Sequence, residues 1–192
     1  IQDIPLLRAD EIKGCVQGVI GIEANNAVTL NELARAGIAV VAVDYWASRA
    51  MFDSAVVDHQ EAGYQATAHL FALGHRRIAF VVEGPDSRST DPTWQDRLAG
   101  YLRAMAELKG ECSWRWLLDV GRSAENARKR LPEFHRRHQP TAYVLCSGSL
   151  AEQALNALGE LGLSCPDDVS LAAADGSCRE YEDGIFAHAR VD

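Results

Sequence analysis

Three aspartates stand at or near the ends of short apolar runs in this 192-residue sequence. Asp44 ends IAVVAVD, Asp119 lies near the end of WRWLLDV, and Asp175 ends VSLAAAD. If these runs are parallel strands, ligands bind beyond their carboxyl ends, where carboxylates accept hydrogen bonds from hydroxyl or amine groups. Each aspartate could instead be a turn or helix-capping residue, a role that Asp favours.

An arginine and two aromatic residues could provide hydrogen-bond donors and flat apolar surfaces beside these carboxylates. Arg97 lies in TWQDRLAGY, where a loop passes into a helix, and its planar guanidinium can donate paired hydrogen bonds. Tyr45 and Trp46 directly follow Asp44 and offer flat faces of the kind that sugars and purines pack against. Taken together, these residues favour a binding site for a small ligand rich in hydroxyl or amine groups.

The sequence lacks the patterns of common catalytic and nucleotide-binding sites. There is no G-x-G-x-x-G after a strand, no G-x-x-x-x-G-K-[ST], and CSGSL has the wrong spacing for G-x-S-x-G. His135 and His138 lie one helical turn apart and could hold a metal, but without further ligands they fit a solvated helix face better. We therefore expect no enzymatic activity, no cofactor and no metal.

Two basic stretches raise the question of nucleic-acid binding. RKRLPEFHRRH lacks the interleaved aromatic side chains of a binding surface, so we interpret it as a solvated helix face. His75, Arg76 and Arg77 follow Gly74, a typical helix-terminating residue, and cations there interact favourably with the helix dipole. Because the net charge is −8, we interpret this triplet as a corner between a helix and the strand IAFVV, and we expect no specific DNA binding by this chain alone.

Short apolar strands alternate with helices along the chain, which predicts an α/β fold with parallel sheets and helices on both sides. The expected strands cover 16–22, 38–44, 54–59, 78–82, 114–120, 141–146, 169–175 and 187–191. The intervening helices carry apolar residues at spacings of three and four, and the helix over 123–138 is expected to kink or break at Pro132.

Composition is that of an ordinary globular protein, with 47% hydrophobic and 24% charged residues, enough for one large domain or two lobes. Five scattered cysteines without a C-x-x-C pair suit reduced thiols in a cytoplasm. No apolar run is long enough to span a bilayer, so we expect no membrane partner. The chain begins in mid-pattern at Ile1, without an initiator Met or a leader, which we interpret as a piece of a longer protein.

Several segments, in order, resemble the effector-binding core of lactose-repressor-type (LacI/GalR) transcriptional regulators. They are VVAVD, VVDHQEAGYQATAHLFALGHRRIAFV, DRLAGY, PTAYVLCSGSLAEQALNALGELGL and CPDDVSLAAAD. The resemblance extends over essentially the whole chain, and LGHRRIAFV and PDDVSL are rather specific to that family. It implies a periplasmic-binding-protein-like fold of two Rossmann-like lobes. An incomplete N-terminal lobe would comprise residues 1–57 plus 186–192, and the C-terminal lobe residues 58–185, with crossings near Val57–Gln60 and Asp183–Ala187.

The same resemblance implies a set of effector-binding residues. Asp44, Arg97 and Asp175 fall on positions that contact the effector, and Tyr45, Thr93, Val120, Ser147 and Val191 fall on positions that line the cleft more variably. Arg97 would be the main donor to the ligand, Asp44 and Asp175 would accept hydrogen bonds from opposite lobes, and Tyr45 would form a stacking wall. As a cleft residue, Arg97 is expected to contribute little to folding, so Arg97→Ala should abolish the effector response and leave the melting temperature nearly unchanged.

Four positions depart from the usual pattern of the family. Gly148 stands where Asp is usual, Val120 where an aromatic is often found, Val191 where Gln is common, and Glu152 where an apolar dimer contact is expected. The DNA-reading head, the hinge helix and the first strand and helix of the N-terminal lobe would lie upstream, and a further segment would follow Asp192.

We therefore expect the ligand-sensing domain of a LacI-type regulator in the cytoplasm. A small effector, sugar-like or nucleobase-like and neutral or weakly charged, would shift the balance between open and closed lobes. Operator DNA would be a partner only through the N-terminal head, and the protein would form a homodimer. The alternative is a solute-binding protein that feeds a transporter, because the same fold serves both functions.

Overall fold

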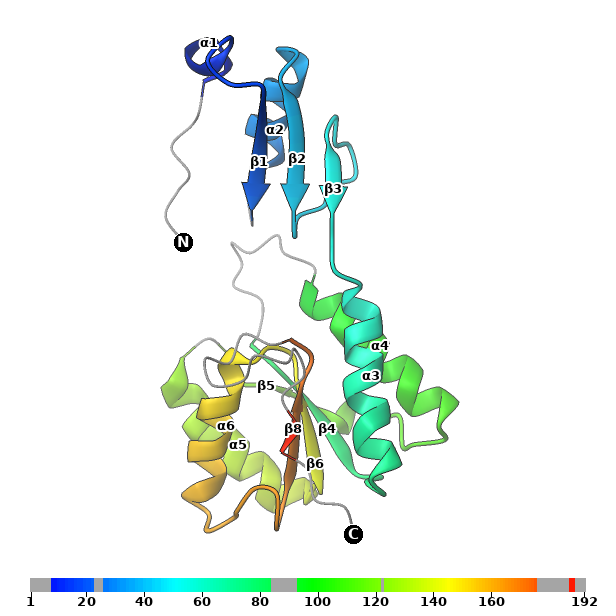
Figure 1. Ribbon diagram of the computed structural model, residues 1–192. Helices are drawn as coiled ribbons and strands as arrows, with labels where there is room; N and C mark the ends of the chain where they lie inside the picture. Colours follow the sequence, from blue (N-terminus) through cyan, green and yellow to red (C-terminus); the bar gives the residue numbers. More distant parts are fainter. Residues whose placement is uncertain (1–7, 23–25, 84–92, 122, 176–186, 189–192) are drawn as a thin grey trace. The chain divides into compact units, whose positions relative to one another are not determined.

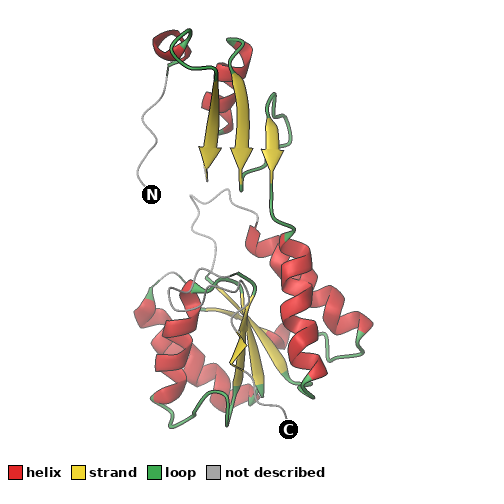
Figure 2. Cartoon of the chain, in the orientation of Figure 1, coloured by secondary structure: helices red, strands yellow, loops and turns green. Residues whose placement is uncertain are grey.

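The computed structural model describes residues 8–22, 26–83, 93–121, 123–175 and 187–188. It divides the chain into two compact units, Ile1–Val57 and Asp58–Asp192. Each unit combines a β-sheet with helices, so the predicted α/β class is confirmed (Figure 2). Within the described ranges, no helix is both long enough and apolar enough to cross a bilayer.

The first unit contains a parallel sheet with the order β1-β2-β3. Its elements are α1 (Ala9–Ile12), β1 (Gly18–Ile22), α2 (Ala27–Arg35), β2 (Ala39–Val43) and β3 (Asp53–Ala55). The side chain of Asn26 caps α2 by accepting a hydrogen bond from the backbone N–H of Thr29 at 3.1 Å. Gly37, just after α2, has a φ of +82°, the left-handed conformation that ends helices and favours glycine.

One face of this sheet packs against α2. Leu30 and Leu33 of the helix form a small core with Val40 and Ala42 of β2. Since side chains alternate along a strand, the neighbouring residues of β1 and β2 point to the other face. Most of them are exposed, and Ile20 of β1 lies in register with one of them, Val41 of β2.

The second unit contains a larger sheet with the order β5-β4-β6-β7-β8. Its strands are β4 (Ile78–Val82), β5 (Leu117–Asp119), β6 (Ala142–Leu145), β7 (Ser170–Ala173) and β8 (Ala187–His188). The first four strands are parallel, and β8 is antiparallel to β7. The main helices are α3 (His59–Ala72), α4 (Thr93–Glu107), α5 (Ala124–His138) and α6 (Ser149–Gly159). Figure 1 shows α3 and α4 on one side of the sheet and α5 and α6 on the other.

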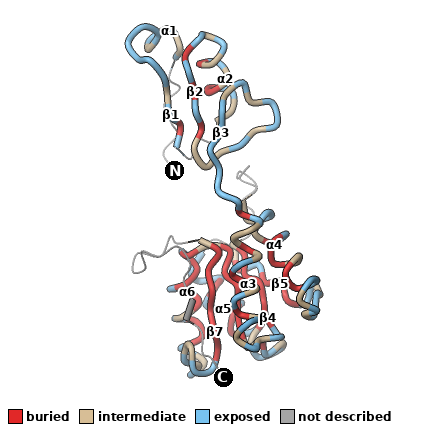
Figure 3. Tube along the Cα trace, turned by 45° about the vertical axis from the view of Figure 1, so that its right-hand side comes forward, coloured by how far each residue is buried: buried red, intermediate tan, exposed pale blue. Residues whose placement is uncertain are grey.

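Every residue of β4, β6 and β7 is buried, as expected for parallel strands covered on both faces (Figure 3). The strand predicted from IAFVV matches β4 residue for residue. In the core, Phe80 packs against the ring of Tyr101, with ring centroids 5.3 Å apart, and the Tyr101 hydroxyl donates to the carbonyl oxygen of Ile78 at 2.9 Å. Burial raises the pKa of the Tyr101 hydroxyl, which therefore stays a neutral donor.

Three local predictions are corrected by the structure. The strand expected over 54–59 ends at Ala55, because Asp58 accepts a hydrogen bond from the N–H of Glu61 and begins α3. The segment expected as a strand over 114–120 starts as a 3-10 turn, Trp114–Trp116. Helix α5 runs through Pro132 without a break, and Pro132 and its neighbour Leu131 are buried; the kink stays a prediction.

The last predicted strand belongs to a different unit from the one expected. The sequence-based division assigns 186–192 to the first lobe, but Ala187–His188 forms β8, which pairs with Leu171 and Ala172 of β7 in the second unit. The assignment of these two residues is corrected because β7 offers them an open sheet edge to pair with. The other residues of 186–192 lie outside the described ranges.

Candidate functional site

Two glycines let helices α3 and α4 approach backbone to backbone. A Cβ atom on Gly63 would lie 2.0 Å from the carbonyl oxygen of Arg97, and one on Gly100 would lie 1.9 Å from the carbonyl oxygen of Gln60. No other residue fits at such distances without moving a helix. This close packing brings the first turn of α3, which begins at His59, beside Arg97 of α4.

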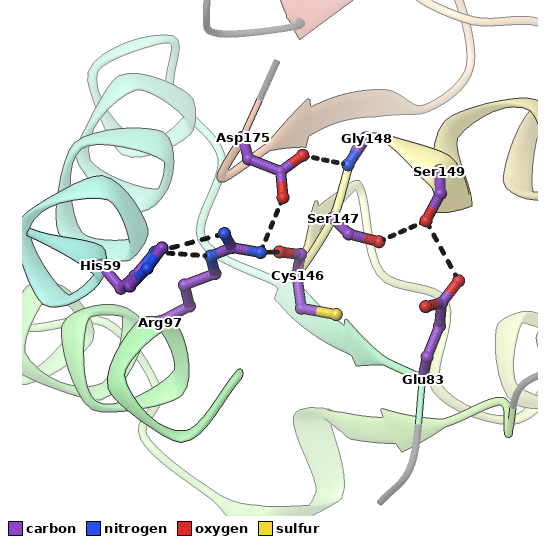
Figure 4. A network of polar contacts seen from close by, with 8 residues as sticks. All are labelled: His59, Glu83, Arg97, Cys146, Ser147, Gly148, Ser149 and Asp175. Atoms are coloured by element: carbon purple, nitrogen blue, oxygen red, sulfur yellow. Dashed lines mark hydrogen bonds and ion pairs between the residues drawn. The ribbon is translucent and has the colours of Figure 1, made fainter. Parts of the chain in front are cut away.

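Arg97 is the centre of a partly buried hydrogen-bond cluster (Figure 4). Its Nη1 donates to Asp175 Oδ2 at 2.7 Å and to the carbonyl oxygen of Cys146 at 2.6 Å. Its Nε and Nη2 lie 3.3 and 3.2 Å from His59 Nδ1. Because a guanidinium only donates, Nδ1 of His59 must be the unprotonated acceptor nitrogen.

The burial of this cluster changes one expectation about Arg97. Only 11% of the Arg97 side chain and 26% of the Asp175 side chain are exposed. Removing one member of such a pair leaves the other charge poorly compensated, which costs stability. We therefore revise the expectation that Arg97 contributes little to folding, and we expect this buried pair to support the fold.

Asp175 connects the cluster to the beginning of α6. While Oδ2 binds Arg97, Oδ1 accepts a hydrogen bond from the backbone N–H of Gly148 at 2.6 Å. Gly148 is the N-cap of α6, and a carboxylate at this position is favoured by the helix dipole. Arg97, Asp175 and the Cys146–Gly148 loop are thus brought together at the carboxyl ends of β6 and β7, where ligands bind in sheets of this type.

A second set of contacts extends from this cluster to the end of β4. The hydroxyl oxygens of Ser147 and Ser149 lie 2.7 Å apart, and the Ser149 hydroxyl donates to Glu83 Oε1 at 3.2 Å. Ser147 was predicted as a site residue, but Glu83, Ser149 and His59 were not. For Glu83 a signal was present, since it directly follows the strand IAFVV, much as Asp44 and Asp175 stand at the ends of their apolar runs.

The thiol of Cys146 lies among the charged groups of this site. Burial raises the pKa of the Cys146 thiol to about 11. The backbone of Glu83 and the charge of Arg97 lower this pKa by smaller amounts, whereas the charges of Glu83 and Asp175 raise it. The thiol is therefore protonated at neutral pH and is a poor nucleophile.

The remaining predicted residues of the second unit differ in their surroundings. Thr93 begins α4, one turn before Arg97. Val120 is completely buried in the core, and its N–H donates to the carbonyl oxygen of Val82, so the expectation that its side chain lines a binding site is corrected. The Asp119 carboxylate accepts from the N–H of Gly121 at 2.7 Å, the turn role left open by the sequence. Val191 lies outside the described residues.

In the first unit, Asp44 and Tyr45 lie directly after β2. Asp44 has a φ of 55°, and its N–H donates to the carbonyl oxygen of Ala55 at 2.9 Å. The rings of Tyr45 and Phe52 stack with centroids 6.4 Å apart and an interplanar angle of 20°. Trp46 leaves 62% of its surface exposed, so flat apolar surface is present beside the carboxylate.

The basic triplet makes the contacts of a structural corner. His75 Nδ1 lies 3.0 Å from Thr141 Oγ1, and Nε2 lies 2.9 Å from Ser170 Oγ. Arg76 stacks on Phe71, and Arg77 Nε donates to a backbone carbonyl oxygen at 2.9 Å. The interpretation as a corner between helix and strand is confirmed. In the described part of the chain, no group of three or more potential ligands could hold a metal ion.

Comparisons with known proteins agree with this architecture. Residues 67–182 match the family model of the periplasmic binding protein-like domain. Over 141 residues the chain is 36% identical to the HTH-type transcriptional repressor PurR of Escherichia coli O1:K1, a match that covers 72% of this chain and 40% of that repressor. The chain belongs to the LacI/GalR type of periplasmic binding protein-like domain.

Solved structures extend this relationship. The LacI/GalR-type domain is 26% identical to a regulatory protein of the LacI family from Chloroflexus aggregans, with a TM-score of 0.71 over 86% of this chain and 61% of that one. A LacI family transcriptional regulator from Enterococcus faecium, solved with bound ribose, is 25% identical, with a TM-score of 0.68 over 87% and 61% of the two chains. These relatives are transcriptional regulators rather than enzymes, and they do not favour the alternative of a solute-binding protein.

Proposed function

We propose that this LacI/GalR-type domain senses a small, hydroxyl-rich effector that is neutral or weakly charged. The observation that carries the proposal is the cluster formed by Arg97, Asp175 and the loop after β6, which gathers donors and acceptors at the carboxyl edge of the sheet. In doubly wound α/β folds this edge is where ligands bind. The ribose bound to the Enterococcus faecium relative supports a sugar-like effector.

The charges of the cluster support an effector without a phosphate group. Arg97 is compensated by Asp175 at 2.7 Å, so this contact leaves no surplus positive charge. A phosphate needs several charged or backbone donors at once. The cluster also includes Glu83, a further carboxylate, which disfavours an anion.

We extend the proposal to the other residues predicted from the family resemblance. Ser147 and Thr93 would contact the effector beside Arg97. Asp44 would accept a hydrogen bond from it, and Tyr45 would stack on it, so that the ligand engages both lobes and favours one lobe arrangement over another. In the full-length cytoplasmic regulator, a homodimer, an upstream head would bind operator DNA in response.

A ligand screen on the 192-residue chain tests this function. Thermal shift and calorimetry would compare sugars, polyols, nucleobases and sugar phosphates, and the best ligand would then be titrated into Arg97→Lys. Because lysine cannot reproduce the forked contacts of arginine, affinity should fall about 10- to 100-fold. Arg115→Lys, whose exposed side chain pairs with Glu111, is the matched control and should bind normally. Stabilisation by sugar phosphates alone, or unchanged affinity of Arg97→Lys, would contradict the proposal.

A further inference from the structure

We infer that Glu83, Ser149 and Ser147 act together as a specificity-determining acceptor surface that selects an effector carrying an amine, such as an amino sugar, over the matching neutral sugar and sugar acid. This inference rests on the proposed function and narrows the class of its ligand. It concerns the part of the site that lies across the ends of β4 and β6 (Figure 4).

Sheet register places the members of this surface side by side. Strands β4 and β6 are parallel, with Val81 paired to Leu145. Continuing this register by two residues sets Glu83 against Ser147, just beyond the strand ends. The contact through the Ser149 hydroxyl, 2.7 Å from Ser147 Oγ and 3.2 Å from Glu83 Oε1, spans the same position.

The direction of the hydrogen bonds decides what this surface offers to a ligand. The carboxylate of Glu83 only accepts, so the single hydroxyl proton of Ser149 is donated to it. Ser149 has no second proton, and Ser147 must therefore donate its own proton to Ser149. With both hydroxyl protons used, only oxygen lone pairs are left to face a ligand. Such a surface binds donors and rejects carboxylates and phosphates.

Glu83 also holds unused charge and acceptor capacity. Its half-buried carboxylate could accept about four hydrogen bonds, and the contact described for it is with Ser149. Among the described residues, none of the ion pairs includes Glu83, whereas both carboxylate oxygens of Asp175 are engaged, by Arg97 and by the N–H of Gly148. Arg97 and Asp175 compensate each other, so Glu83 leaves the site with one negative charge. A protonated amine supplies the missing positive charge and the donors together.

Calorimetric titration of the 192-residue chain with glucose, glucosamine and glucuronate tests the inference, at a pH that keeps the amine protonated. Wild type should bind glucosamine about tenfold more tightly than glucose, and glucuronate most weakly, because hydrogen bonds to a charged group are stronger than neutral ones. In Glu83→Gln the preference for glucosamine over glucose should fall about tenfold. Glu152→Gln, an exposed glutamate of α6, is the control and should keep the wild-type ranking.

A second variant tests the direction of the hydrogen bonds without changing the charge. Ser149→Ala frees the proton of Ser147 to face the ligand, so the penalty against glucuronate should shrink several-fold. Equal binding of glucose and glucosamine by wild type, or wild-type affinity ratios among the three sugars in both variants, overturns the inference and leaves the proposed function standing. If none of the three sugars binds the wild-type chain but another sugar or polyol of the screen does, the inference fails and the proposed function stands. If no sugar, polyol or nucleobase of the screen binds, both fail.

Discussion

The two sheets of this protein differ in how their faces are covered. In the second unit, each residue of β4, β6 and β7 is buried between helices on both sides. In the first unit, β2 alternates between exposed and buried residues, and in β1 Ile20 and Ile22 are 70% and 69% exposed. The second unit holds most of the described core. Because buried apolar area stabilises a fold, we expect its sheet to contribute more to stability than the sheet of the first unit.

The two units also differ in how far their ion-paired side chains are buried. In the described part of the first unit they join Arg8 to Asp10 and Glu11, all three with well-exposed side chains. The second unit has exposed pairs as well, but also the partly buried pair of Arg97 and Asp175. The Arg97 cluster therefore lies in the unit whose central strands are fully buried.

The largest expected change in the free energy of unfolding comes from substitutions that compare the two sheets directly. Phe80→Ala removes a fully buried ring from β4 and should lower the free energy of unfolding by about 3–5 kcal/mol. Ile20→Ala, on the exposed face of β1, should change it by less than about 0.5 kcal/mol. Urea denaturation followed by circular dichroism measures both variants. Similar losses for the two would show that the sheets are equally well buried.

A smaller loss is expected when the buried ion pair is broken. Arg97→Ala leaves Asp175 without its guanidinium partner and should cost about 3 kcal/mol. The exposed Arg8→Ala should have almost no effect, because surface ion pairs contribute little. Urea midpoints of the two variants decide the matter. A wild-type midpoint for Arg97→Ala would restore the view of this residue as a ligand contact alone.

The contact between α3 and α4 gives the next test. A methyl group at Gly100 would collide with the carbonyl oxygen of Gln60, so Gly100→Ala should force the helices apart and cost about 1–3 kcal/mol. Displacing α4 should also weaken effector binding through Arg97. Gly159→Ala in α6 is the matched control, because an added Cβ meets no atom within 4 Å, and it should be neutral or stabilising by up to about 1 kcal/mol. Thermal melts of both variants would show no difference if the close approach were unimportant.

The smallest expected effect is a pH dependence from His135 in the second unit, which contains all six histidines. Burial lowers the pKa of His135, whose Nδ1 lies 2.9 Å from the Tyr143 hydroxyl. As the pH falls through the usual histidine pKa of about 6.5, His135 becomes protonated in the unfolded chain but stays neutral in the folded protein. Protonation therefore favours the unfolded state, and the free energy of unfolding decreases. The decrease ends once the pH is below the lowered folded-state pKa.

His135→Gln should make this acid-induced loss of stability shallower. Urea midpoints of wild type and variant, measured between about pH 7.5 and pH 5, test the expectation, because the variant lacks the titrating group. Parallel curves for the two proteins would assign the pH dependence to other groups.

Much of the architecture was predictable from the sequence because it depends on local patterns. Five consecutive apolar residues in IAFVV predicted β4 to the residue, and Gly74 with the basic triplet predicted the corner before it. The alternation of strands and helices predicted the α/β class, and the specific segments LGHRRIAFV and PDDVSL predicted the LacI/GalR type. Each of these features is encoded by residues close together in the chain.

The composition of the site was decided by the tertiary structure. His59 and Arg97 are 38 residues apart and Arg97 and Asp175 are 78 apart, and they meet because two glycines let α3 and α4 touch and because the strand order places β7 next to β6. The register between β4 and β6 likewise places Glu83 beside Ser147 and Ser149. The side chain of Val120 is buried in the core. Such contacts depend on which elements become neighbours in space, and no local pattern of residues specifies that.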